Sequence, residues 1–114
     1  SDWLSDTDAL LLLNYLTTCD KMIILKFSAD WCMPCKRLAP IVRETAQECS
    51  NDIIVIEIDI DNAPTLRDML SVSAVPTLIY FKNGRQVDRT HGVSKETLLD
   101  KIQKIIAVKS SSRQ

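Results

Sequence analysis

Two short apolar runs constrain the fold of this chain more than any other feature of the sequence. The first is KMIILKFS at Lys21–Ser28, and the second is DIIVIEIDI at Asp52–Ile60. Nearly continuous apolar runs of this length, rich in β-branched residues, are typical of strands that are covered on both faces of a sheet. We therefore expect both segments to be buried strands, with other elements packed above and below them.

Helical patterns alternate with these strands. The apolar run Ala9–Leu16 follows SDTD, which has the spacing of a capping box, and Pro34–Cys49 carries apolar residues at helical intervals. Asn62, as a cap, and an early proline predict a short helix that ends at Leu70. Ser94 is expected to cap a last helix, whose inner stripe is Leu98, Leu99, Ile102, Ile105 and Ile106.

The sequence PTLIYFKNGRQVDRTHG, which begins at Pro76, predicts a hairpin with Asn83-Gly84 as its tight turn. The resulting order is helix, strand, helix, strand, helix, hairpin, helix. This alternation predicts an α/β fold with a central mixed β-sheet and helices on both of its faces. The 114 residues contain no repeat and no linker, so we expect one domain at residues 1–108 and a flexible tail at residues 109–114.

Composition argues against several classes of partner. Charged residues make up 25% of the chain and the formal net charge is −1, so we expect neither nucleic acid nor an anionic membrane surface. No segment approaches the ~20 apolar residues that a membrane span needs. Aspartates rather than lysines precede the run at Ala9, which is unlike a secretory signal, and we expect a cytoplasmic monomer. The chain starts at Ser1 without Met, which leaves room for a processed N-terminus.

Two of the four cysteines stand in a C-x-x-C motif within SADWCMPCKRLAP, at Ser28–Pro40. Such a pair can be half of a zinc site, a structural staple, or a dithiol that opens and closes. A structural zinc site needs four ligands, usually in two close pairs. Cys19, Cys49 and His91 stand apart in the sequence, so we expect no metal, and we expect His91 to be a surface strand residue.

A structural staple explains the motif poorly. In the loop-entropy model the short Cys32–Cys35 ring stabilises a fold by roughly 2 kcal/mol, whereas a Cys19–Cys49 bridge would contribute roughly 3–4 kcal/mol. A chain in need of a staple gains more from the longer loop, so we interpret the motif as redox-active. Cys19 and Cys49 are expected to be small hydrophobic thiols, with regulatory oxidation or an intermolecular bridge as the alternative.

The position of the motif predicts its chemistry. Cys32 falls where a strand ends, and Cys35 lies in the first turn of the next helix. Side chains three residues apart in a helical turn are about 5–6 Å apart, so a small adjustment makes or breaks a disulfide. Unpaired amides and the positive end of the helix dipole favour a thiolate at Cys32, which we expect to be exposed and nucleophilic. Cys35 is expected to resolve the resulting mixed disulfide.

The chain resembles the thioredoxin family over about Asp20–Ile106. The resemblance rests on W-C-x-P-C-K, on a later proline–threonine step, and on the hairpin and helix that follow. The matching residues are Phe27, Ala29, Trp31, Cys32, Pro34, Cys35, Lys36, Pro40, Asp61, Val75, Pro76, Thr77, Phe81, Asn83, Gly84 and Gly92. The resemblance implies a thioredoxin fold and reduction of protein disulfides. It also implies a redox-active disulfide in place of a cofactor, with electrons returned from NADPH by a thioredoxin reductase.

A surface that binds disulfide-containing target proteins is implied as well. It would consist of Trp31, Met33, Pro34, Val75, Pro76, Gly92 and Val93. Val75–Pro76 would be a cis peptide facing the dithiol, and Val75 would offer backbone hydrogen bonds to an extended target segment. Asp61 lies at the same rim beside Asp59, and we expect it to tune the site.

Two positions depart from the family pattern. Met33 stands where the common form has glycine, which either enlarges the apolar rim or is tolerated as a surface substitution. Lys26 stands where the family usually has a buried aspartate. A charged Lys26 near Cys35 would favour the thiolates, a neutral one could act as a base, and in a third reading its ammonium reaches out past the sheet edge. We expect Lys26 to make the dithiol less strongly reducing and more acid-tolerant.

Two other functions are compatible with the motif. A disulfide oxidase or isomerase of secretory compartments would be a stronger oxidant, and a non-enzymatic thioredoxin-fold interaction module would carry the dithiol incidentally. The presence of both cysteines together with Trp31 and Pro76 argues against the module. The favoured prediction is a thiol-disulfide oxidoreductase that reduces protein disulfides.

Overall fold

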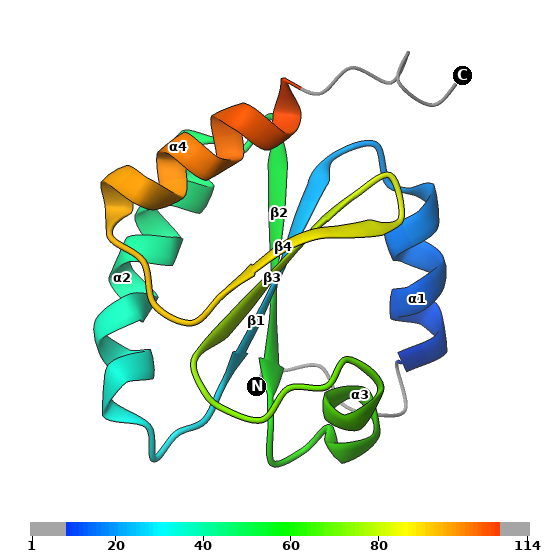
Figure 1. Cartoon of the computed structure of the whole chain (residues 1–114), viewed down its shortest axis with the longest axis vertical. Coiled ribbons are helices and arrows are strands. Elements are labelled where there is room, and N and C mark those ends of the chain that lie inside the picture. Colours follow the sequence, from blue (N-terminus) through cyan, green and yellow to red (C-terminus); the bar gives the residue numbers. More distant parts are fainter. Residues whose placement is uncertain (1–8, 108–114) are drawn as a thin grey trace.

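The computed structural model of the chain describes residues 9–107. Within that range the elements follow the expected order (Figure 1): α1 (Ala9–Thr18), β1 (Met22–Ser28), α2 (Met33–Glu48), β2 (Ile53–Asp59), α3 (Pro64–Met69), β3 (Thr77–Lys82), β4 (Arg85–Thr90) and α4 (Lys95–Ile106). The expected capping sequence at residues 5–8 and the expected tail at residues 109–114 lie outside the described residues.

The strands form one mixed sheet in the order β2-β1-β3-β4. β1 runs parallel to β2 and antiparallel to β3, and β3 is antiparallel to β4. In Figure 1, α2 and α4 cover one face of the sheet, and α1 and α3 cover the other. The predicted architecture, a central mixed sheet between two helical layers, is confirmed.

Strand β1 is the centre of the fold, and all seven of its residues are buried. Its side chains alternate between the two faces, as the pleat of a strand requires. Ile23, Leu25 and Phe27 pack in a cluster with residues of α1 and α3, whereas Met22 and Ile24 pack with residues of α2 and α4. Burial on both faces is the reason that the sequence of β1 shows no polar alternation.

Strand β2 is less buried than its sequence predicted. It lies at the edge of the sheet with β1 as its neighbour, and of its seven residues Ile53 and Ile58 are the buried ones. The expectation of a second fully buried strand was therefore wrong. An apolar run reports that a strand packs on helices, but it does not distinguish an edge strand from a central one.

The turns and caps show where local sequence decides the backbone. Asn83 and Gly84 both have positive φ, 54° and 80°, which is the conformation of a two-residue hairpin turn. A Cβ at Gly84 would also lie 3.3 Å from Thr17 of α1. Ser94 caps α4 as predicted, because its Oγ accepts a hydrogen bond from the amide of Thr97.

The predicted cap of α3 was wrong. Ala63 is the N-cap residue of α3 and makes no side-chain hydrogen bond, while the Asn62 side chain donates to Asp59 Oδ2 at 3.1 Å. Asn62 therefore stabilises the turn after β2 instead of the helix. An Asn shortly before a proline is compatible with both arrangements, because the Asn side chain forms similar hydrogen bonds to the backbone in turns and at helix caps.

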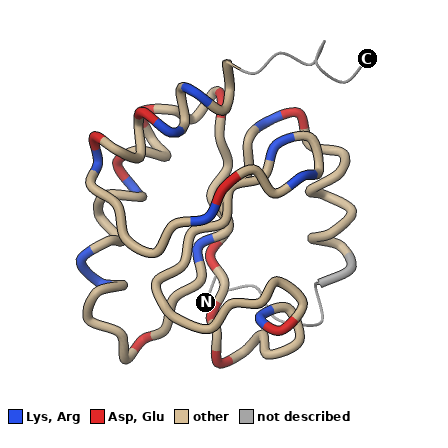
Figure 2. Tube along the Cα trace, in the orientation of Figure 1, with Lys and Arg blue, Asp and Glu red and all other residues tan. Residues whose placement is uncertain are grey.

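Charged residues of both signs are spread over the outside of the fold (Figure 2). The first half of α2 is different, since it carries blue segments and no red. None of the helices within residues 9–107 is long and apolar enough to cross a membrane.

Candidate active site

The two motif cysteines lie at the start of α2 and form a disulfide, with their Cα atoms 5.3 Å apart. Cys32 is the N-cap residue of α2, and its Sγ accepts a hydrogen bond from the amide of Cys35 at 3.2 Å. An N-cap side chain normally accepts from an amide in this way, and the acceptor bond is stronger when the acceptor is negative. This amide therefore stabilises a thiolate at Cys32 once the disulfide is reduced.

Cys32 is less exposed than the sequence led us to expect. Both Cys32 and Cys35 expose only 4% of their surface, while the flanking Trp31 and Met33 are 67% and 58% exposed. Both cysteines belong to the core cluster that includes residues of α1 and α3, and the Val75 carbonyl lies beside Cys32 Sγ. A partner sulfur must therefore approach along a restricted direction between large apolar side chains.

The loop before β3 closes one side of the dithiol. Val75–Pro76 is a cis peptide, as the resemblance implied, and the carbonyl oxygen of Val75 lies 3.7 Å from Cys32 Sγ. A groove of 340 Å³ lies beside it, between α2 and the loops that flank the β3–β4 hairpin. The residues that line the groove are Pro34, Arg37, Leu38, Ile41, Ala74, Val75, Pro76, His91, Gly92 and Val93.

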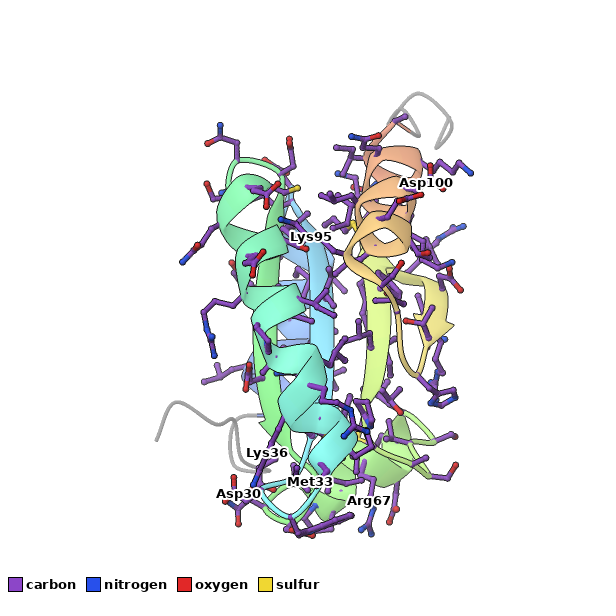
Figure 3. All side chains as sticks on the ribbon, turned by 90° about the vertical axis from the view of Figure 1, so that its left-hand side faces the viewer. Asp30, Met33, Lys36, Arg67, Lys95 and Asp100 are labelled. Atoms are coloured by element: carbon purple, nitrogen blue, oxygen red, sulfur yellow. A yellow bond between two sulfur atoms is a disulfide. The ribbon has the colours of Figure 1, made fainter. Side chains whose placement is uncertain are left out.

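Trp31 and Asp61 lie on the other side of the dithiol. The indole Nε1 of Trp31 donates a hydrogen bond to Asp61 Oδ2 at 2.9 Å, so the acid that was expected to tune the site holds the indole. The carboxylate of Asp59 accepts a hydrogen bond from the amide of Asp61 at 3.0 Å and orders the loop. Figure 3 shows Asp30, Met33 and Lys36 together at this end of α2.

Lys26 is buried in β1, with only 3% of its side chain exposed. Its ammonium Nζ lies 3.1 Å from Oε1 of Glu57, its partner residue on the edge strand β2. Among the hydrogen bonds and ion pairs of residues 9–107, none joins Lys26 to Cys35. The reading in which the ammonium reaches out past the sheet edge is wrong, because the side chain stays buried and pairs with Glu57 of the edge strand.

Comparison with known proteins shows the family in which these features occur together. The family model for thioredoxin matches residues 12–104. The chain belongs to the thioredoxin family. It is 38% identical to a thioredoxin of Chlamydia trachomatis over 84 residues, which are 73% of this chain and 81% of that protein. It is also 38% identical to a thioredoxin of Rickettsia typhi over 94 residues, which are 82% of this chain and 90% of that one.

A solved structure supports the same placement. The germline-specific thioredoxin Deadhead of Drosophila melanogaster matches with a TM-score of 0.78 and 26% sequence identity, over 92% of this chain and 98% of that chain. The thioredoxin fold is thereby confirmed. The family and the paired cysteines make this protein a thiol-disulfide oxidoreductase that reduces protein disulfides, with a redox-active disulfide and no prosthetic group.

Sequence reasoning about this thioredoxin missed part of the groove. Arg37, Leu38 and Ile41 line the groove but were not among the expected site residues, and His91 was expected in a strand. His91 in fact follows β4, and its Nδ1 lies 3.2 Å from Thr77 Oγ1. A signal was available for α2, because Pro34, Arg37, Leu38 and Ile41 follow the spacing of one helix face.

The remaining cysteines of this thioredoxin are free. Cys19 packs against the cluster under α1, and Cys49, at the end of α2, packs against the cluster under α4. This agrees with small hydrophobic thiols. Within residues 9–107 no three His, Cys, Asp or Glu side chains gather as a metal site would require.

Proposed function

We propose that Cys32 is the nucleophile and Cys35 the resolving cysteine in the reduction of disulfides in other proteins. The observation that carries the assignment is the position of Cys32 Sγ, which accepts the amide hydrogen bond of Cys35 at the start of α2. An amide donor and the helix dipole both favour negative charge on that sulfur. Cys35 lies within the first turn of α2, where its own amide is the donor to Cys32 Sγ.

The exchange has two steps. The Cys32 thiolate attacks one sulfur of the target disulfide, forms a mixed disulfide, and releases the first target thiolate. Cys35, as a thiolate, then attacks Cys32 Sγ, forms the Cys32–Cys35 disulfide, and releases the second target thiolate. Two electrons pass from the dithiol to the target, and the two thiol protons end on the two target sulfurs.

Target binding is assigned to the surface around the dithiol. Val75 offers its carbonyl beside Cys32 Sγ, which suits an extended target segment that pairs with the loop as an added strand. Trp31 provides an exposed apolar face, and Asp61 fixes the indole that presents it. Gly92 and Val93 form the opposite wall of the groove.

Electrons return from NADPH through a thioredoxin reductase in this proposal, and the protein works as a cytoplasmic monomer on disulfide-containing targets. The test is a coupled assay with insulin as substrate and a thioredoxin reductase, in which NADPH consumption is followed by absorbance. NADPH loss that depends on both proteins and disappears in Cys32→Ser supports the proposal. A protein that reduces insulin when chemically reduced, but is not re-reduced by the reductase, contradicts the electron route.

The reduction potential separates the alternatives. Thioredoxins have potentials of about −270 mV, whereas protein disulfide isomerase is near about −180 mV. Equilibration with glutathione buffers and quantification of the Cys32–Cys35 disulfide gives the value. A potential near the first figure supports a reductase, and one near the second supports a secretory-type oxidase or isomerase. If the protein exchanges no disulfide with glutathione, the non-enzymatic interaction module is the alternative that remains.

A further inference from the structure

We propose that the groove beside the dithiol selects target segments that carry an acidic side chain close to the disulfide cysteine. This inference rests on the proposed function, because it names the class of segment that the same surface binds. The groove joins the first half of α2 to the loops at Val75 and Gly92. A segment that pairs with Val75 therefore passes over the groove lining next to the reacting sulfur.

The groove is apolar except for two side chains, one of which is a cation. Eight of its lining residues are apolar or glycine, and the other two are Arg37 and His91. None of the lining residues is acidic. Arg37 comes from α2, whereas His91 comes from the loop after β4, so the two polar groups stand on opposite walls.

Arg37 has its guanidinium available for a ligand. The side chain is exposed, and among residues 9–107 it forms no ion pair with an acid of this chain. Other cations of the fold are engaged, as Lys95 is with Glu44 and Glu48 on the second half of α2. A planar guanidinium binds carboxylates by two parallel hydrogen bonds, which makes it the natural partner for an acidic side chain.

The hydrogen bond between His91 and Thr77 determines which ring nitrogen of His91 carries a proton. The Thr77 hydroxyl donates its proton to the carbonyl of Ala74 at 2.6 Å, so the contact between Thr77 Oγ1 and His91 Nδ1 needs a proton on Nδ1. The ring is therefore held in one orientation, with Nδ1 turned to Thr77 and Nε2 as its other polar atom at the groove.

The surroundings favour the same sign of charge. The first half of α2 carries Lys36 and Arg37 and no acid (Figure 2), and this half includes the positive end of the helix dipole. Asp59 and Asp61 are engaged by hydrogen bonds with the Trp31 indole and within the turn after β2, and Asp30, beside Lys36 in Figure 3, is not part of the groove lining. A target with an acidic side chain would meet Arg37 in the groove, while a basic side chain would meet an uncompensated cation.

The test uses disulfide-linked homodimers of a short peptide with blocked termini and one cysteine. The residues two positions to either side of the cysteine are both Glu, both Gln or both Lys. The reduced full-length protein is mixed with each peptide, and the second-order rate constant of reduction is measured by acid quenching and chromatography. We expect the Glu peptide to react about fivefold faster than the Lys peptide, with the Gln peptide between them.

Variants assign the preference to the groove. Arg37→Glu should reverse the order of the Glu and Lys peptides, and Arg37→Gln should reduce the ratio toward one. Arg43→Gln is the matched control, because Arg43 is an exposed arginine of the same helix outside the groove, and it should keep the wild-type ratio. Added salt should weaken the preference, since rim charges are screened.

The outcomes separate this inference from the proposed function. Equal rates for the three peptides, or a ratio that Arg37→Glu leaves unchanged, overturn the acidic preference while disulfide reduction stands. A preference that Arg43→Gln removes as well would overturn the assignment to the groove. Failure to reduce any of the peptides, and insulin too, would overturn the proposed function itself.

Discussion

Helix α2 has a cysteine at each end, and the two sulfurs have opposite surroundings. Cys32 is its N-cap and Cys49 its C-cap. At Cys32 a backbone amide donates to the sulfur, whereas at Cys49 burial, Glu48 and Asp52 raise the pKa of the thiol, with burial as the largest cause. The comparison teaches that the position on the helix, more than the residue type, decides which thiol becomes a nucleophile.

The charged residues near the two ends of α2 differ as well. Figure 3 shows Lys36 near the beginning of α2, with Lys95 beside its other end. Lys95 pairs with Glu44 and Glu48, so its charge is neutralised there. Within residues 9–107, Lys36 forms no ion pair with an acid, whereas Lys95 at the other end forms two.

Replacing each sulfur in turn should give the largest contrast. Cys32→Ser should lower the rate of peptide disulfide reduction by about 10³-fold or more, because the attacking group is lost. Cys49→Ser should leave the rate within about twofold of wild type, since Cys49 packs against the core away from the groove. Thermal unfolding of both variants checks that they fold. An active Cys32→Ser protein would end the assignment of the nucleophile.

Alkylation of the reduced protein should sharpen the contrast without mutation. At neutral pH, Cys32 should react with iodoacetamide about 50-fold faster than Cys49, because the thiolate is the reacting species. A raised pKa means that Cys49 holds less thiolate at neutral pH than an ordinary cysteine, and its rate should climb only in alkaline buffer. Mass spectrometry of the digested protein measures both rates. Equal rates at neutral pH would contradict the comparison.

The sequence could predict features that depend on neighbouring residues in the chain, but not contacts between distant segments. The order of elements, the Ser94 cap and the Asn83-Gly84 turn follow from local propensity, which acts through neighbours in the chain. The roles of Cys32 and Cys35 followed from the spacing of the motif and its position between a strand and a helix, whereas the cis peptide and the target-binding surface came from family resemblance. The pairing of Lys26 with Glu57 did not emerge, because it depends on strand register between residues 31 positions apart.

Other misses have the same origin. The edge position of β2 is a property of the sheet, and the low exposure of Cys32 comes from its packing in a core cluster built from several elements. His91, in the loop after β4, lines the groove and contacts Thr77 of β3. Local patterns specify what each segment becomes, whereas such contacts depend on where the segments meet.

The Lys26–Glu57 pair, on neighbouring strands of the sheet, should change the thiolate titration at the N-terminal end of α2 by a smaller amount. If the charge of Lys26 favours the dithiol thiolates, Lys26→Met should move their titration to higher pH and Glu57→Gln to lower pH. The charge-swapped double variant Lys26→Asp, Glu57→Lys keeps an ion pair and should move the titration further up. Ultraviolet thiolate absorbance measures the titration, and we expect alkylation of Cys32 at neutral pH to change by about threefold.

Stability separates a structural role for this pair from a tuning role. Glu57→Gln leaves a buried ammonium without its charged partner and should lower the free energy of unfolding by about 1–2 kcal/mol, less than for a fully buried pair because Glu57 is 44% exposed. Lys26→Met should have little effect, since the acid it leaves reaches water. If stability follows this order and the titrations coincide, Lys26 is structural only.

The smallest expected effect lies at the C-terminal end of α2. Glu48→Gln removes one of the charges that raise the pKa of Cys49, so alkylation of Cys49 in alkaline buffer should become about twofold faster. Glu44→Gln is the matched control, because Glu44 also pairs with Lys95 but is not among the groups that raise this pKa. A gain in Glu44→Gln as well would assign the effect to the released Lys95. Because burial is the larger cause, Cys49 should stay slower than Cys32 at neutral pH in both variants.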